Sequence, residues 1–366
     1  MADRIRVGIV GATVTQGGSG WGANAHVPAL HALPAYELKA VCTAHEATAK
    51  ASAGKYGAAL AFHNMDDMVA HPDIDLVVVC VRVPGHYDLV MKSLRAGKPT
   101  FCEWPLGANL KEAEEMAGLA RAKSLRTIVG LQARSDPTVM YAHELIEEGY
   151  IGEVLAVHLS VLSAAQLERG SGRVWQRERK SGANTLTIAG GHALEAMCTI
   201  LGEFTEVSAR VATKITEWRN TDTGENVPVD SPDVINAAGR LENGAEVSVR
   251  IASVPFGGGS TRLDIYGRGG AMSLAAGGAL SVGPNRLLAT RGREAATELE
   301  VPDRFKLVPE GASAGSPRNV AQAYMRFVDT KGNGGGFDPD FDLAVQRHRL
   351  IDAIERSSAE ARAVRL

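Results

Sequence analysis

The stretch Ile5-Arg-Val-Gly-Ile-Val-Gly-Ala-Thr13 decides the fold expected for this chain. Its first six residues are rich in β-branched side chains and stop at Gly11, which predicts a strand followed by a turn. Glycines continue beyond it at positions 17, 18, 20 and 22, before Asn24-Ala25-His26. Only glycine lets turn amides approach a pyrophosphate without a Cβ clash, and a following helix N-terminus favours the anion. The stretch therefore indicates a dinucleotide site, with a turn longer than Gly-x-Gly-x-x-Gly and a helix that starts late, near Asn24.

The rest of the first 130 residues alternates between strand-like and helix-like runs. Ile74–Val81 is almost continuously apolar, which is typical of a strand buried on both faces of a parallel sheet. Asn109 with Glu112 has the pattern of a capping box, which predicts a helix start. Further strands are expected at 37–42, 99–103 and 127–131, and further helices at 26–33, 44–56 and 86–96. This alternation predicts a doubly wound parallel sheet, a Rossmann domain, over residues 1–130.

The pattern changes after residue 130. A helix begins at Asp136-Pro137, and strand-like runs with few helices between them follow at 154–161, 205–213, 234–241, 245–252 and 261–266. One helix is expected over 190–201, and two helices close the chain, the first from Ser316-Pro317. Residues 131–366 are therefore expected to form a second α/β domain with an antiparallel or mixed sheet.

Composition excludes several classes of protein. The 39 basic and 42 acidic residues give a net charge of −3 with no basic block, so a nucleic-acid surface has no support. No run approaches the roughly 20 apolar residues that span a bilayer, and the N-terminal residues do not resemble a signal peptide. The four cysteines form no Cys-x-x-Cys pair and are expected to be reduced core thiols, with no metal site. We expect a soluble, cytoplasmic protein.

The end of the second strand bears on the choice of cofactor. NAD-specific Rossmann domains often carry a carboxylate there for the ribose hydroxyls, whereas here Thr43 follows the strand and His45 lies nearby. A missing carboxylate removes the repulsion against a 2′-phosphate. NADP is therefore slightly favoured over NAD, although no arginine is present to bind the phosphate.

Several motifs together resemble the Gfo/Idh/MocA oxidoreductase family over nearly the whole chain, and their order and spacing make the set specific. Within the family, Glu103-Trp-Pro105, Leu131-Gln-Ala-Arg134 and Gly191-His192 look most similar to the galactose-repressor-like branch. The motifs that carry the family resemblance are Val7-Gly-Ile-Val-Gly11, Ala25-His-Val-Pro-Ala-Leu30, Ile74-Asp-Leu-Val-Val-Val79, Val83-Pro84 with His86, Ala96-Gly-Lys-Pro99, Glu103-Trp-Pro105, Gly149-Tyr-Ile-Gly-Glu-Val154, Pro339-Asp-Phe-Asp-Leu-Ala344 and Leu350-Ile-Asp-Ala-Ile354.

The resemblance implies a Rossmann domain and a C-terminal α+β domain with a large, mostly antiparallel, open-faced sheet. It implies homo-oligomers, dimers or tetramers, formed through that sheet, and closing helices that pack back near the Rossmann domain. It also implies hydride transfer between NAD or NADP and a small, carbohydrate-like molecule. The residues that it places at the cofactor are Gly8, Gly11, Ala12, Thr13, Gly22, Ala25, Thr43, His45, Val81, Val83, His86, Glu103, Trp104 and Gln132.

The usual catalytic set of the family is incomplete here. Relatives carry a lysine where this chain has Trp104, and an aspartate four residues before a histidine, where this chain has Ile188 before His192. His192 is expected to act as general base, Glu195 to orient its ring, and Lys180 to supply the missing cation. Trp104 either stacks against a substrate or simply blocks the lysine position.

Three functions fit this pattern. The first is an NAD(P)-dependent oxidoreductase for a sugar-like or cyclic hydroxyl compound, with a non-standard catalytic set centred on His192. The second is a dinucleotide-binding sensor or regulator without turnover, like the galactose repressor. The third is a lyase-like or hydrolase-like enzyme that oxidises its substrate transiently and recycles its cofactor.

Overall fold

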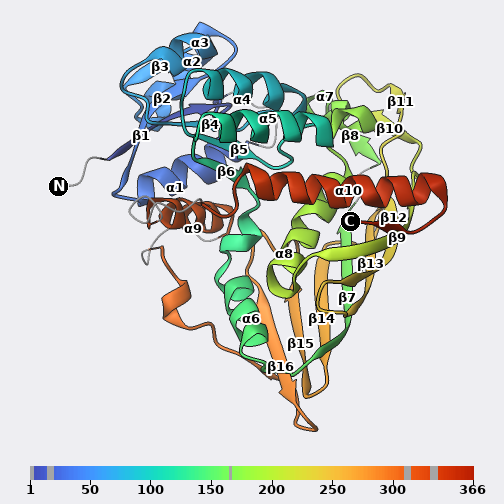
Figure 1. Ribbon diagram of the computed structural model, residues 1–366. Helices are drawn as coiled ribbons and strands as arrows, with labels where there is room; N and C mark the ends of the chain where they lie inside the picture. Colours follow the sequence, from blue (N-terminus) through green and yellow to red (C-terminus); the bar gives the residue numbers. More distant parts are fainter. Residues whose placement is uncertain (1–3, 15–19, 165–166, 309–314, 330–336) are drawn as a thin grey trace. The chain divides into compact units, whose positions relative to one another are not determined.

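The computed structural model describes residues 4–14, 20–164, 167–308, 315–329 and 337–366 (Figure 1). Gly17 and Gly18 of the glycine-rich turn lie outside the described residues. The chain divides into two compact units, which are described separately here. Unit 1 comprises residues 1–130 and 307–346, and unit 2 comprises residues 131–306 and 347–366. The second stretch of unit 1 lies within the region that the sequence analysis assigned to the second domain.

Unit 1 is built on a six-stranded parallel sheet with the strand order β3-β2-β1-β4-β5-β6. The order reverses between β1 and β4, as in a doubly wound sheet, so the expected Rossmann fold is confirmed. Its strands are β1 Ile5–Val10, β2 Tyr36–Cys42, β3 Leu60–Phe62, β4 Leu76–Val79, β5 Thr100–Glu103 and β6 Thr127–Gly130. All four residues of β4 are buried, which explains its unbroken apolar sequence.

Helices connect these strands. Asn109 caps the N-terminus of α5 by accepting from the Glu112 amide at 3.0 Å, as its sequence pattern predicts. The first helical stretch begins at Gly22, two residues earlier than expected, because its first turns are π-helical. The helices of unit 1 are η1 Gly22–His26, α1 Val27–Ala32, α2 Glu46–Tyr56, α3 Met65–Ala70, η2 Val83–Gly85, α4 His86–Arg95, α5 Leu110–Ala122 and α9 Ser316–Asp329.

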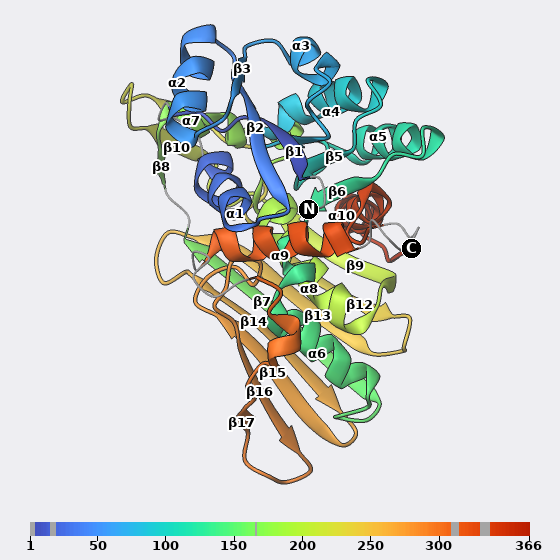
Figure 2. The ribbon, with the colours of Figure 1, turned by 90° about the vertical axis from the view of Figure 1, so that its left-hand side faces the viewer.

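Helix α9 completes the core of unit 1, although it lies far away in sequence. Val320, Tyr324 and Phe327 recur at helical spacing and are buried in one apolar cluster with residues of β1 and α1. The helix packs against η1 and α1, and Figure 2 shows it running beside α1. The helical stretch formed by η1 and α1 is therefore held partly by the C-terminal region of the chain.

Unit 2 contains a nine-stranded sheet with the order β17-β16-β15-β14-β7-β13-β12-β9-β18. All its strand pairs are antiparallel except β7 with β13, so the expected mostly antiparallel sheet is confirmed. Its strands are β7 Val154–Ala164, β9 Phe204–Ala212, β12 Val234–Leu241, β13 Glu246–Val254, β14 Ser260–Gly267, β15 Gly270–Ala276, β16 Arg286–Arg291, β17 Thr297–Glu298 and β18 Val364–Arg365.

The two faces of this sheet differ in the character of their side chains. In β7, Val157, Leu159 and Val161 are buried, whereas His158 between them is exposed. The buried face is covered by η6 (Thr185–Gly190), α6 (Pro137–Glu147) and α8 (Gly191–Leu201). The opposite face is open within the described chain.

The remaining elements of unit 2 surround the large sheet. Helix α10 (Phe341–Glu360) starts in unit 1 and continues in unit 2, where it runs along β9. A small sheet contains β8 Glu168–Arg169, β10 Glu217–Asn220 and β11 Asn226–Pro228. Short helices are η3 Gln132–Ser135, α7 Ser171–Val174, η4 Trp175–Arg177, η5 Arg179–Ser181 and η7 Asp303–Phe305.

Candidate functional site

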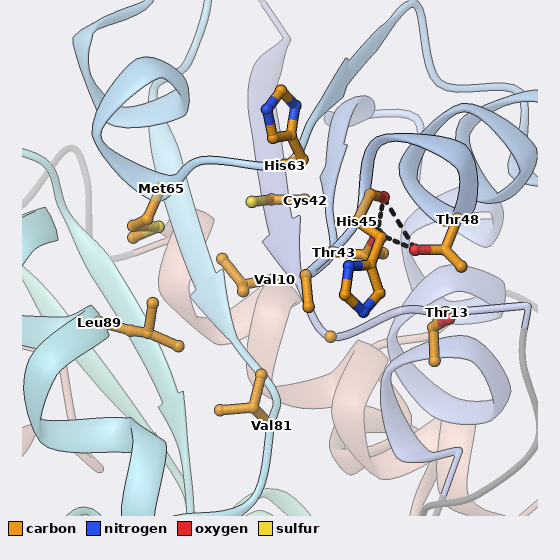
Figure 3. Close-up of a pocket in the computed structure, with 12 residues that line it drawn as sticks. Val10, Thr13, Cys42, Thr43, His45, Thr48, His63, Met65, Val81 and Leu89 are labelled. Carbon is orange, nitrogen blue, oxygen red and sulfur yellow. Dashed lines mark hydrogen bonds between the residues drawn. The ribbon is translucent and has the colours of Figure 1, made fainter.

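A cavity of about 390 Å³ lies at the carboxyl ends of β1, β2 and β4 in unit 1 (Figure 3). Ligands of doubly wound sheets bind at this edge, beside the point where the strand order reverses. Apolar side chains line much of the cavity, and threonine and histidine side chains supply polar groups, a combination that fits adenine and ribose. The lining residues are Val10, Gly11, Thr13, Cys42, Thr43, Ala44, His45, Thr48, His63, Met65, Val81 and Leu89.

The turn after β1 depends on glycine. Gly11 has φ +101°, and a Cβ there would lie 2.0 Å from the Cys80 carbonyl oxygen at the end of β4. A side chain is therefore excluded both by backbone conformation and by space. Ser52 and Tyr56 of α2 hold the next residues, because their hydroxyl groups bond the Val14 amide and the Thr13 carbonyl.

The end of β2 carries a small hydroxyl network instead of a carboxylate. The Thr43 and Thr48 hydroxyls lie 2.6 Å apart, and each is within donating distance of the His45 carbonyl. Both hydroxyl protons therefore have acceptors within the protein. The twelve lining residues drawn in Figure 3 include no Asp or Glu.

Seven of the cavity residues were not expected from the sequence. Three of them, Val10, Cys42 and Ala44, lie at the ends of β1 and β2 beside expected residues, and the other four come from elsewhere in unit 1. Thr48 lies on α2, His63 and Met65 follow β3, and Leu89 lies on α4. The three-residue β3 has too little periodicity to be recognised, so the residues after it had no predicted place at the sheet edge. Thr48 could have been expected at the cavity from the sequence, because it lies in the first turn of the helix that follows Thr43.

The Glu103-Trp104-Pro105 segment follows β5. Its Trp104–Pro105 peptide bond is cis, and Trp104 is buried with 5% of its surface exposed. His86, in the first turn of α4, lies with Nδ1 2.8 Å from the Pro105 carbonyl oxygen and Nε2 3.1 Å from that of Val81. Burial lowers the pKa of His86, and the two carbonyl groups oppose that shift. His86 is therefore an anchor for this segment.

Glu103 is bonded to a second buried histidine. His26 Nε2 lies 2.7 Å from Glu103 Oε1, and His26 Nδ1 lies 2.9 Å from the Tyr324 hydroxyl of α9. His26 is completely buried. A neutral imidazole satisfies both neighbours when it donates from Nε2 to the carboxylate and accepts from the tyrosine.

The other expected cofactor residues occupy different places. Gly8 lies inside β1 against Met68 and Ile74, while Ala12 lies against Gly22 at the start of η1. Ala25 and Val83 are buried, the first within the core of unit 1. Gln132 is buried in η3 of unit 2. Within the cavity of unit 1, the structure brings together Gly11, Thr13, Thr43, His45 and Val81.

The three expected catalytic residues all belong to unit 2. His192 is half-buried near the start of α8, in a helical stretch that begins earlier than expected, at Thr185, where Asn184 and Thr187 form a capping box. Lys180 is exposed and lies 3.1 Å from Glu178. Glu195 is completely buried.

Glu195 belongs to a buried network of charges. Its two oxygens accept from Arg134 Nη1 and Arg347 Nε, both at 2.8 Å, and Thr199 adds a third contact at 3.1 Å. Arg347 is itself completely buried and bonds Glu203 as well. These contacts occupy the carboxylate that the sequence analysis expected to orient His192.

The part of the chain that the structure describes contains neither a disulfide nor a metal site. All four cysteines are buried and free, and no group of His, Cys, Asp or Glu in the described residues is arranged to hold a metal ion. Among the helices that the structure describes, none is long and apolar enough to cross a membrane.

Comparison with known proteins identifies the class to which this fold belongs. Residues 5–131 match the Gfo/Idh/MocA family model, described as an oxidoreductase family with an NAD-binding Rossmann fold. Residues 137–276 match the model of the Gal80p C-terminal domain. The chain belongs to the Gfo/Idh/MocA oxidoreductase family, with a Gal80-like C-terminal domain, as its motifs predict.

Three relatives illustrate the range of the family. The dehydrogenase aclE of Aspergillus oryzae is 30% identical over 375 residues, which cover 98% of this chain and 97% of the relative. The galactose/lactose metabolism regulatory protein GAL80 of Saccharomyces cerevisiae is 28% identical over 306 residues, 75% of this chain and 67% of the relative. A crystal structure of levoglucosan dehydrogenase with NADH and levoglucosan has the same fold, with a TM-score of 0.86 at 22% identity over 100% of this chain and 99% of that one. The relatives thus include both dehydrogenases and a regulator.

Proposed function

We propose that this chain is an NAD(P)-dependent oxidoreductase that transfers a hydride between nicotinamide and a hydroxyl or carbonyl group of a sugar-like or cyclic small molecule. The observation that carries the proposal is the cavity at the carboxyl ends of β1, β2 and β4, in a chain that belongs to an NAD-binding family. Gly11, Thr13, Thr43, Thr48 and His45 would hold the adenosine half of the cofactor. When bound, the nicotinamide would supply the hydride chemistry.

His192 is the proposed acid–base group. Oxidation of an alcohol requires a group that takes the hydroxyl proton, and histidine does this near neutral pH. His192 is half-buried near the start of α8, and its Nδ1 is buried. We propose a structural role for Glu195, because its oxygens are bonded to two arginines. Lys180, which is 83% exposed and paired with Glu178, is a weaker candidate for the missing cation.

The test is a binding and turnover series. Cofactor binding is measured by quenching of tryptophan fluorescence with NAD(H) and NADP(H), and cofactor reduction is then screened with polyols and sugars. His192→Ala is expected to lower kcat by about 10² to 10⁴, the usual contribution of general acid–base catalysis, with cofactor affinity unchanged. His143→Ala, at an exposed histidine of α6 in the same unit, is the matched control. Full turnover by His192→Ala would remove His192 from the mechanism.

A second candidate function is a dinucleotide-binding regulator without turnover. The observation that favours it is Trp104, a buried side chain at the position where the resemblance places a catalytic lysine. The similarity to GAL80, a regulatory protein, supports this candidate. Tight dinucleotide binding without cofactor reduction across a broad panel of substrates would favour this function over the first.

For the cofactor, we propose a preference for NADP. The support is the lack of any carboxylate among the twelve residues drawn around the cavity. Because the Thr43 and Thr48 protons have acceptors within the protein, we propose the imidazoles of His45 and His63 as side-chain donors to a 2′-phosphate. Equal or better affinity for NAD would overturn this preference.

We further propose that the chain forms a homo-oligomer, a dimer or tetramer, through the open face of the nine-stranded sheet. This face carries Tyr266, which is 50% exposed. Its neighbours across the strands are Ala156 and Ala271, whose small side chains leave the tyrosine ring accessible.

A further inference from the structure

Three buried side chains connect the beginning of α1, the end of β5 and the middle of α9. They run from the Tyr324 hydroxyl through the imidazole of His26 to the carboxylate of Glu103. The rings of Phe101 and Tyr324 pack edge-on against the imidazole, at 4.9 and 5.8 Å between centroids. The ring of His26 is therefore fixed by two hydrogen bonds and by packing.

The sheet makes room for the carboxylate at one residue. Glu103 of β5 pairs with Gly130 of β6, and a Cβ at Gly130 would lie 2.4 Å from Glu103 Oε2. The absent side chain lets the carboxylate lie over the end of β6. A carboxylate with 9% exposure needs a partner, because desolvation disfavours its charge, and the imidazole N–H of His26 is that partner.

Trp104 lies between two anchors. On one side Glu103 is bonded to His26, which is the last residue of η1. On the other side the Pro105 carbonyl is bonded to His86 of α4. The helical stretch that ends at His26 starts at Gly22, directly after the glycine-rich turn. One chain of bonds thus ties the proposed pyrophosphate segment to the residue beside the proposed nicotinamide site.

We infer that His26 is a positioning residue: through Glu103 and Tyr324 it fixes Trp104 relative to η1, so that the two halves of the dinucleotide site keep their spacing. The inference rests on the proposed function. It assigns His26 no contact with cofactor or substrate.

The test compares Tyr324→Phe and His26→Gln with the control Tyr36→Phe. Tyr324→Phe removes the hydroxyl that bonds His26, whereas Tyr36→Phe removes an equally buried hydroxyl that donates to the Tyr324 carbonyl, at 2.7 Å. Binding of NADH and of ADP is measured by calorimetry. ADP reports on the adenosine cavity alone, and NADH on both halves of the site. Each protein is also made with the additional substitution Trp104→Phe. The difference between the two near-UV circular dichroism spectra is the signal of Trp104.

We expect Tyr324→Phe and His26→Gln to weaken NADH binding about fivefold, which corresponds to the net contribution of one hydrogen bond, and to leave ADP binding unchanged. The Trp104 signal should change in both variants and remain the same in Tyr36→Phe. Equal weakening of ADP and NADH, or an unchanged Trp104 signal in Tyr324→Phe, would overturn the inference and leave His26 with a role in stability alone. If the unmodified protein binds no pyridine nucleotide, the proposed function fails, and the Trp104 signal alone decides whether His26 positions this segment.

Discussion

Glu103 and Glu195 are both buried carboxylates, and their partners give them different roles. Glu195 lies between two arginine side chains, at 2.8 Å from each. Removing one member of such a buried pair typically costs about 3–5 kcal/mol of stability, so this carboxylate is committed to holding unit 2 together. Glu103 is bonded to the imidazole of His26 and directly precedes Trp104. At the scale of single residues, the partner decides whether a carboxylate serves the fold or the site.

Cofactor choice is tested at His45. His45→Asp places a carboxylate at the end of β2 and is expected to weaken NADP binding about tenfold or more relative to NAD, because it repels the 2′-phosphate. The fold should tolerate the change, since this residue is the N-cap of α2, where aspartate is favourable. His45→Asn, of equal size and without charge, is the control. Fluorescence titrations with both cofactors give the ratio, and an unchanged ratio in His45→Asp would show that the phosphate does not lie there.

The acid sensitivity of the protein should depend on His348 of α10. Burial lowers the pKa of this histidine from 6.5 to about 3. Between these two values the unfolded chain binds a proton that the folded protein does not, so the free energy of unfolding decreases as the pH falls below 6.5. For this group the loss between about pH 7 and pH 5 is about 2 kcal/mol. His86, whose pKa burial also lowers, adds a loss of the same sign.

Urea unfolding at the two pH values measures this effect. In His348→Gln the difference between the two pH values should shrink by about 2 kcal/mol, whatever the variant's stability at neutral pH. His143→Gln, at an exposed position of α6, should behave like the unmodified protein. An equal pH dependence in all three proteins would contradict the assignment.

Among the elements, β9 is the strand whose outer edge is protected by side chains. β18 pairs with it at Glu206 and Val207 only. Further along, the amides of Ala209 and Val211 donate to the hydroxyls of Ser357 and Ser358 in α10, at 2.9 and 2.8 Å. The helix thus covers strand amides that would otherwise be open to pairing with another chain.

Ser357→Ala is expected to lower the free energy of unfolding by about 1–3 kcal/mol, because it leaves the Ala209 amide without its acceptor. Hydrogen exchange at Ala209 should become faster. Ser358→Ala should have a smaller effect at Val211, since Ser358 is only half-buried and water can replace its hydroxyl. Unchanged exchange at Ala209 in Ser357→Ala would show that this bond contributes little.

The strands differ in whether their sequence patterns could predict them. β4 was predictable because an unbroken apolar run needs burial on both faces, and β1 because its β-branched residues stop at Gly11. β15 was not, because it starts at Gly270 and contains three alanines among its seven residues, a composition typical of loops and helices. The cavity residues that follow β3 were missed with the strand itself. The contact between His26 and Glu103 joins residues 77 positions apart, and no local pattern specifies such a pair.

At the scale of the whole molecule, the open sheet face is the proposed surface of association. In size-exclusion chromatography with light scattering, we expect the mass of a dimer or tetramer. Tyr266→Lys should shift the equilibrium toward the monomer, because it places a charge at the centre of an interface. Phe256→Lys is the control, since Phe256 is 88% exposed in the loop between β13 and β14. A monomeric mass for the unmodified protein would refute the oligomer.

The return of α9 to unit 1 affects how such proteins can be recombined. Because residues 307–346 complete the Rossmann unit, a gene fragment that stops at codon 130 encodes a sheet without the helix that carries Tyr324. His26 would then lose its hydroxyl partner, and the apolar face of α1 would lose its cover. To exchange the second unit between relatives, the segment between residues 130 and 307 must therefore be replaced within the chain, so that both stretches of the cofactor unit remain in place. Joining residues 1–130 of one relative to the remainder of another would fail.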